Sequence, residues 1–115
     1  MKATKDFLIF QKHFTYWRER FGLTGYKVYF KYEPIDGAFA DICVQEAQKV
    51  ATIRLNSELP DKDKPHKNIK RTAKHEAIHL MLHKFEDLAF NRYLREGEVT
   101  EAEEEIVFKL EKLIV

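Results

Sequence analysis

Hydrophobic side chains recur every three or four residues near the beginning of this chain. Because an α-helix repeats about every 3.6 residues, they form one apolar stripe of a helix. Thr4 can cap the start of this helix and Gly22 can end it. We expect its aromatic side to pack on a core and to have a structural role only. The stripe consists of Phe7, Phe10, Phe14, Trp17 and Phe21.

The apolar period changes to two in the next segment. Residues 26–33 alternate between a side with Tyr26, Val28, Phe30 and Tyr32 and a mostly charged side, and Pro34 ends the pattern. This is typical of a strand with one buried face. Ala38–Val44 and Val50–Leu55 predict two further strands. Because three short strands follow one another, we expect a small antiparallel three-stranded sheet.

The second half of the chain is predicted to be helical. Ile69–Phe85 contains neither glycine nor proline, and we expect a bend near its end. Asp87–Arg95 predicts a further helical piece that ends near Gly97, and Thr100 is expected to begin the final helix. The predicted class is therefore α+β, with a leading helix, a sheet and C-terminal helices.

Length and charge narrow the function classes. At 115 residues the chain predicts a single domain, 1–115, and a net charge of +1 argues against a nucleic-acid or membrane-surface binder. The single cysteine, Cys43, excludes an internal disulfide and is expected to be a buried strand residue. With neither a signal peptide nor a membrane-length apolar run, we expect a soluble, cytoplasmic monomer.

Residues 75–79 read His-Glu-Ala-Ile-His, which is an H-E-x-x-H motif inside the predicted helix. Positions i and i+4 lie one turn apart on the same face, so His75 and His79 can bind one metal ion. Zn²⁺ suits two imidazoles, a third protein ligand and a water molecule. Glu76 can reach that water as a general base.

The third ligand is expected in the final helix, which begins with four glutamates. On a helical wheel Glu103 falls in the middle of the apolar face, whereas Glu104 falls at its edge. Because a core-facing carboxylate is costly unless it is paired or bound to a metal, this favours Glu103. However, Thr100 and Glu103 also fit a capping box, and Glu104 is then the ligand. His83 is too far along the helix to join His75.

The motif, followed about 24 residues later by a glutamate, resembles the gluzincin metallopeptidases. The likeness is greatest to minigluzincins and to SprT-like and ImmA/IrrE-like domains, since Glu103-x-x-Ile106-Val107 is similar to the glutamate helix of the ImmA-like proteins. The resemblance implies a minimal zincin fold and a zinc-dependent endopeptidase that acts on peptide or protein substrates. A zinc-binding regulatory or structural domain without peptidase activity is the alternative.

The resemblance also implies roles around the cleft. An extended substrate would lie against Ala38–Val44, and an oxyanion donor is needed besides zinc. Tyr93 is the first candidate for that donor, and Arg92 and His66 are the others. The apolar residues 113–115 either pack on the core or lie near the cleft and hold the enzyme latent, as in the self-inhibited minigluzincins.

Overall fold

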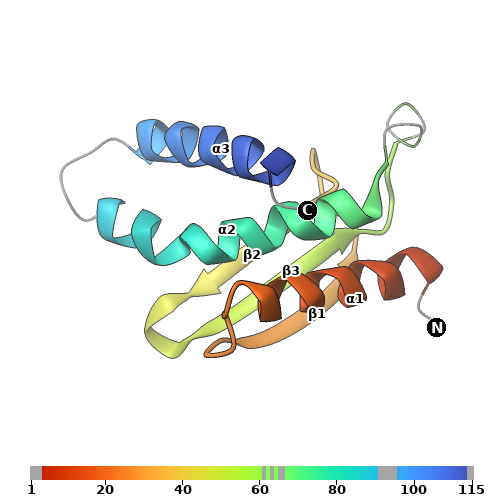
Figure 1. The fold of residues 1–115 in the computed structure, drawn as a ribbon. Coiled ribbons are helices and arrows are strands. Elements are labelled where there is room, and N and C mark those ends of the chain that lie inside the picture. The colour runs from red at the N-terminus through yellow and green to blue at the C-terminus, as the bar shows by residue number, and fades with distance from the viewer. Residues whose placement is uncertain (1–3, 61, 63, 65–66, 91–95, 114–115) are drawn as a thin grey trace.

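The computed structural model describes residues 4–60, 62, 64, 67–90 and 96–113. Three helices and a three-stranded sheet form an α+β fold (Figure 1), which confirms the predicted class with a leading helix, a motif helix and a C-terminal helix. The elements are α1 (Lys5–Arg20), β1 (Lys27–Glu33), β2 (Ala40–Gln45), the 3₁₀ turn η1 (Glu46–Gln48), β3 (Val50–Asn56), α2 (Ile69–Phe90) and α3 (Glu96–Leu113).

Helix α1 forms as its apolar stripe predicts. The Thr4 side chain accepts a hydrogen bond from the Phe7 amide at 3.1 Å, so the expected N-cap is present. Phe10, Phe14 and Trp17 are buried, and Phe7 and Phe21 are partly buried against the same core. The Phe10 and Phe14 rings meet Phe30 of β1 edge to face, which places the stripe on the sheet as expected.

The direction of the first strand differs from the expected antiparallel meander. The strand order is β1-β3-β2, with β1 parallel and β2 antiparallel to β3, so the sheet is mixed. The central strand is β3, whose Ala51, Ile53 and Leu55 are the most deeply buried strand residues. The prediction was wrong because sequence neighbours need not pair when a later strand carries the more buried side chains.

Asn56 holds the chain where β1 crosses over to β2. Only 6% of its surface is exposed, and its side-chain amide donates to the carbonyl oxygens of Ile35 and Ala38. Its side-chain oxygen accepts from the amides of Ile35 and Glu58. One buried polar residue at the end of β3 therefore fixes both the β1–β2 connection and the chain that leaves the sheet.

Helices α1 and α2 cover one face of the sheet, and α3 packs on α2 on the side away from the sheet (Figure 1). The separate helical piece expected from Asp87 is wrong as far as Phe90, because α2 continues as one helix to that residue. Helix α3 begins at Glu96 rather than at Thr100. Gly97 therefore lies inside a helix, and the expected helix end there is also corrected.

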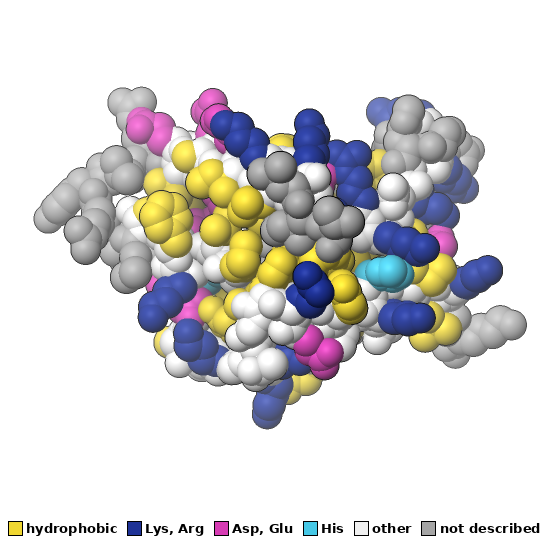
Figure 2. All heavy atoms as spheres, viewed as in Figure 1, with side chains coloured by type: hydrophobic (Ala, Val, Ile, Leu, Met, Phe, Trp, Pro, Cys, Tyr) yellow, Lys and Arg dark blue, Asp and Glu magenta, His cyan; other side chains and the backbone are white. Residues whose placement is uncertain are grey.

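Cys43 is exposed, not buried as predicted, because it alternates with Ile42 and Val44 and lies on the solvent face of the edge strand β2. Hydrophobic side chains gather over the middle of the face drawn in Figure 2, with Lys and Arg side chains around them. In the described part of the chain, every helix is too short or too polar to cross a membrane.

Candidate metal centre

The two motif histidines lie one turn apart on α2 and point to the same place. Their Nε2 atoms are 3.2 Å apart, and the ring centroids are separated by 4.9 Å. Both side chains are partly exposed, at 19% for His75 and 15% for His79. This is the arrangement that the i, i+4 spacing predicts for two ligands of one ion.

Glu104 of α3 completes a three-residue cluster. Its Oε1 lies 2.5 Å from Nε2 of His79, and its Oε2 lies 3.7 Å from Nε2 of His75. One ligand atom from each of the three side chains falls within 4.8 Å of the others, so the group could hold a metal ion. Two imidazole nitrogens and a carboxylate oxygen are a donor set that Zn²⁺ accepts.

Glu103 lies on the opposite side of His79. It is 5% exposed, and its Oε1 is 3.4 Å from Nδ1, the ring nitrogen that points away from the cluster. The alternative capping box is excluded, because Thr100 lies inside α3 rather than at its N-cap. The geometry therefore places Glu104 beside both Nε2 atoms. The choice between Glu103 and Glu104 as the metal ligand stays a prediction.

A second acid stands next to Glu103. Burial raises the pKa of Glu86 to about 8, and a hydrogen bond with Glu103 acts in the same direction. Burial alone would also raise the pKa of Glu103, but hydrogen bonds from His79 and Glu86 lower it below its ordinary value. Glu103 is therefore the charged member of this pair, and Glu86 carries the proton.

Glu76 is buried beside the cluster, with 5% of its surface exposed. This burial raises its pKa from 4.5 to about 7, although the nearby His79 acts in the opposite direction. A carboxylate whose pKa lies near neutrality can both accept and release a proton at physiological pH. Its burial in a cleft and its raised pKa make Glu76 a candidate for proton transfer.

Two hollows meet at these side chains. One, of about 520 Å³, is lined by the loop before β2, the first half of α2, and Phe108 of α3. The other, of about 530 Å³, runs along β2 between α2 and α3. Both are lined by Ala40, His75, Glu76 and Glu104. The cluster of His75, His79 and Glu104 therefore lies where the two hollows meet, with the edge strand β2 along one side.

The other residues singled out from the sequence have different outcomes. Tyr93, Arg92 and His66 lie outside the described residues, as do Ile114 and Val115 at the C-terminus. His83 does not join the cluster, as expected from its spacing: its Nδ1 is 3.0 Å from Oε1 of Glu46. It therefore ties η1 to α2.

Glu111 was not identified as a site residue from the sequence. This residue is 4% exposed, and its Oε2 lies 2.6 Å from Nδ1 of His75, while Arg71 donates from Nε to its Oε1. These donors lower the pKa of Glu111 although burial alone would raise it. Its position seven residues after Glu104, two turns along the same helical face, was the available signal.

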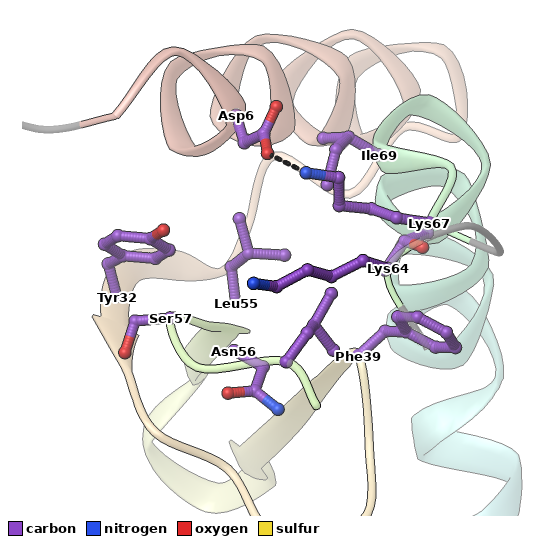
Figure 3. Close-up of a pocket in the computed structure, with 11 residues that line it drawn as sticks. Asp6, Tyr32, Phe39, Leu55, Asn56, Ser57, Lys64, Lys67 and Ile69 are labelled. Carbon is purple, nitrogen blue, oxygen red and sulfur yellow. Dashed lines mark hydrogen bonds and ion pairs between the residues drawn. The ribbon is translucent and has the colours of Figure 1, made fainter. Parts of the chain in front are cut away.

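A separate pocket of about 170 Å³ lies where α1 begins, between the end of β3 and the start of α2 (Figure 3). Lys67 forms an ion pair across it with Asp6, with 2.6 Å between Nζ and Oδ2. It contains none of the cluster residues. The ion pair connects the beginnings of α1 and α2.

Comparisons with known proteins give little further information. No protein-family model matches the sequence, and no curated protein is similar to it. Among solved structures, the metallopeptidase zymogen jannalysin of Methanocaldococcus jannaschii is 20% identical, with a TM-score of 0.44 over 96% of this chain and 95% of that chain. A likeness at this level carries no argument about activity, which rests on the site itself.

Proposed function

We propose that this chain is a zinc-dependent endopeptidase of the gluzincin type, related to minimal domains such as the minigluzincins. One observation carries the proposal: the Nε2 atoms of His75 and His79 converge with Glu104 beside a buried Glu76, in the middle of a cleft. Two imidazoles, one carboxylate and an adjacent second carboxylate are what metal-assisted amide hydrolysis requires.

The donor atoms fit zinc in kind, and the two imidazole nitrogens fit it in spacing. Zn–N and Zn–O bonds of about 2.0–2.1 Å place the ligand atoms of a tetrahedral site about 3.3 Å apart. The separation of 3.2 Å between the two Nε2 atoms is close to this value. Glu104 lies less evenly, with its Oε2 at 3.7 Å from Nε2 of His75 and its Oε1 at 2.5 Å from Nε2 of His79. Three protein ligands leave the fourth position open for water and substrate.

Glu76 is the residue that moves the proton. Bound zinc would polarise the amide carbonyl and make a water molecule more acidic. Glu76, buried beside the cluster, would accept the proton of that water and then pass it to the leaving amine. We further propose Tyr93 as an oxyanion donor on the strength of the sequence alone.

The substrate is proposed to be an extended peptide. Strand β2 lies at the edge of the sheet and lines the cleft from Ala40 to Val44. An edge strand offers main-chain amide and carbonyl groups to a second strand, so a peptide can pair with it across the cluster. This mode of binding recognises the main chain of the peptide. Any preference for particular peptide side chains then depends on the pockets on either side of the cluster.

The decisive experiment compares the wild type with Glu76→Gln. We expect about one zinc per chain in both proteins by elemental analysis, and hydrolysis of denatured casein by the wild type only. Equal cleavage by the two proteins would exclude Glu76 as the base. Zinc binding without wild-type cleavage would favour the zinc-binding domain without peptidase activity.

Latency is tested with the same assay. A variant that lacks residues 113–115 should cleave casein faster than the full chain if this terminus restrains the enzyme. Far-ultraviolet circular dichroism controls for loss of the fold. Unchanged cleavage in a folded variant would show that the terminus has a structural role only.

A further inference from the structure

His75 is contacted on the side away from the cluster by a carboxylate from another helix. Oε2 of Glu111 lies 2.6 Å from Nδ1 of His75, while Nε2 of the same ring points to His79 and Glu104. A carboxylate at this distance accepts a hydrogen bond from Nδ1–H. The proton of a neutral imidazole then lies on Nδ1, and the Nε2 lone pair is free.

We propose that Glu111 is a positioning residue for the metal centre, which holds His75 with Nδ1 protonated and Nε2 free to bind the ion. This inference rests on the proposed function, because it assumes that His75 is a ligand. The inference gives a role to the buried carboxylate of Glu111, which takes no direct part in peptide hydrolysis. Such partners orient a ligand ring and make its metal-binding nitrogen more basic.

The surroundings of Glu111 favour this role over a simple ion pair with Arg71. Its side chain is 3% exposed, whereas that of Arg71 is 56% exposed, so the carboxylate is held inside the protein while the cation lies at the surface. Its two oxygens have separate partners, with Oε1 facing Arg71 and Oε2 facing His75. Arg71 therefore orients the carboxylate without displacing the histidine.

Helix α3 restrains the His75 ring from two further positions. The Phe108 ring packs against it with 5.3 Å between centroids, and Glu104 approaches its Nε2. Glu104, Phe108 and Glu111 follow one another at spacings of four and three residues, so they lie along one face of α3. One helical face thus supplies a metal ligand, a packing surface and an acceptor for Nδ1.

The test is zinc affinity, measured by competition with a chromophoric chelator. Glu111→Gln keeps the size of the side chain but removes its charge, and we expect its zinc dissociation constant to rise ~10–100-fold. Glu111→Ala should lose at least as much. Glu105→Gln is the matched control, because Glu105 lies on the same helix, is 66% exposed and pairs only with Lys109 among the described contacts. Its affinity should equal that of the wild type.

A second measurement does not depend on zinc or on the variants. Two-bond ¹H–¹⁵N spectra of the zinc-free wild type at pH 8 report which nitrogen of each histidine carries the proton. We expect His75 to be protonated on Nδ1. An Nε2–H tautomer would overturn the proposal, even if the Glu111 variants fail to fold.

The outcomes separate the two proposals. If folded Glu111→Gln binds zinc as tightly as the wild type, the proposed role of Glu111 is wrong and the peptidase proposal stays intact. A wild type that binds no zinc overturns both. A variant that melts at a lower temperature but keeps its zinc affinity shows a structural role only, which also contradicts the proposal.

Discussion

At the scale of single residues, Glu103 and Glu104 are neighbours in the chain but meet His79 on different ring nitrogens. Glu104 lies 2.5 Å from Nε2, on the side of the cluster, and Glu103 lies 3.4 Å from Nδ1. Adjacent helical residues point about 100° apart, so both cannot face the same side. The two positions predict different consequences for metal binding.

We predict that Glu104→Gln weakens zinc binding by more than about 100-fold, because it removes a ligand, whereas Glu103→Gln weakens it by about 10-fold. Isothermal titration or chelator competition measures both. The two variants control for each other, since they remove the same charge from adjacent positions. A larger loss in Glu103→Gln would restore Glu103 as the third ligand.

Burial of Glu76 predicts a pH dependence in the zinc-free protein. Its pKa is raised from 4.5 to about 7, so the folded state binds this proton more tightly than the unfolded state. The stabilisation is fully present below pH 4.5 and is lost as the pH rises through 7. Glutamine stays neutral, so Glu76→Gln should be more stable than the wild type at pH 8, by up to about 3 kcal/mol.

Urea denaturation of both zinc-free proteins at pH 4 and pH 8 measures this difference, which should nearly vanish at the lower pH. Glu105→Gln provides an exposed control whose stability should match the wild type at both values. A wild type more stable than Glu76→Gln at pH 8 would contradict the burial argument.

At the scale of elements, α1 depends on its aromatic stripe. Phe14 is fully buried and meets Phe30 of β1 with 5.5 Å between ring centroids. We predict that Phe14→Ala lowers the free energy of unfolding by about 3–5 kcal/mol, because it leaves a cavity between helix and sheet. Leu8→Ala, at a position on α1 that is 59% exposed, is the control. A loss below about 1 kcal/mol at Phe14 would show that the stripe does not hold the helix.

The turn η1 is held by charge rather than by apolar packing. Burial would raise the pKa of Glu46, but hydrogen bonds from Lys49, His83 and Tyr26 lower it to about 2. Its stabilisation is therefore present above pH 4.5 and is lost as the pH falls toward 2. We predict that Glu46→Gln costs about 1–2 kcal/mol at pH 7.

The cost of Glu46→Gln should shrink between pH 4.5 and pH 3, measured by denaturant unfolding. Glu19→Gln, on the exposed side of α1, should have no effect at either pH. A cost that is independent of pH would mean that shape, rather than charge, joins η1 to α2.

At the scale of the whole molecule, the candidate metal site lies between two helices that also meet through apolar packing and through the Arg71–Glu111 ion pair. Helix α3 packs on α2, with Val107 fully buried, and it lies on the side of α2 away from the sheet. A ligand that binds only the folded state stabilises it by about 2.7 kcal/mol at 100 times its dissociation constant. Zinc should therefore raise the melting temperature, and chelation should lower it.

Scanning calorimetry measures this shift, and hydrogen exchange should show the largest gain in protection along α3. Magnesium is the control, because it prefers octahedral oxygen ligands and should have little effect. Equal stabilisation by both metals would indicate a non-specific acidic site instead.

The sequence by itself predicted most of the elements and the pair of histidines at the centre of the candidate site, because both depend on local periodicity. The stripe of α1, the alternation in β1 and β3 and the i, i+4 histidines all follow from the repeat of one helix or strand. It could not determine that β1 runs parallel to β3, because strand pairing depends on which side chains are buried best together. The position of Asn56 at the crossover became visible only with that topology.

Tertiary structure alone decided what surrounds the two histidines. The positions of Glu103 and Glu104 depend on how α3 is rotated against α2. A helical wheel built on Val107 places Glu103 at the centre of the apolar face. It does not show which histidine nitrogen Glu103 contacts. Glu111 was missed for the same reason, since its partner His75 lies 36 residues earlier in the chain. Local spacing fixes which atoms one helix presents, but only packing fixes what meets them.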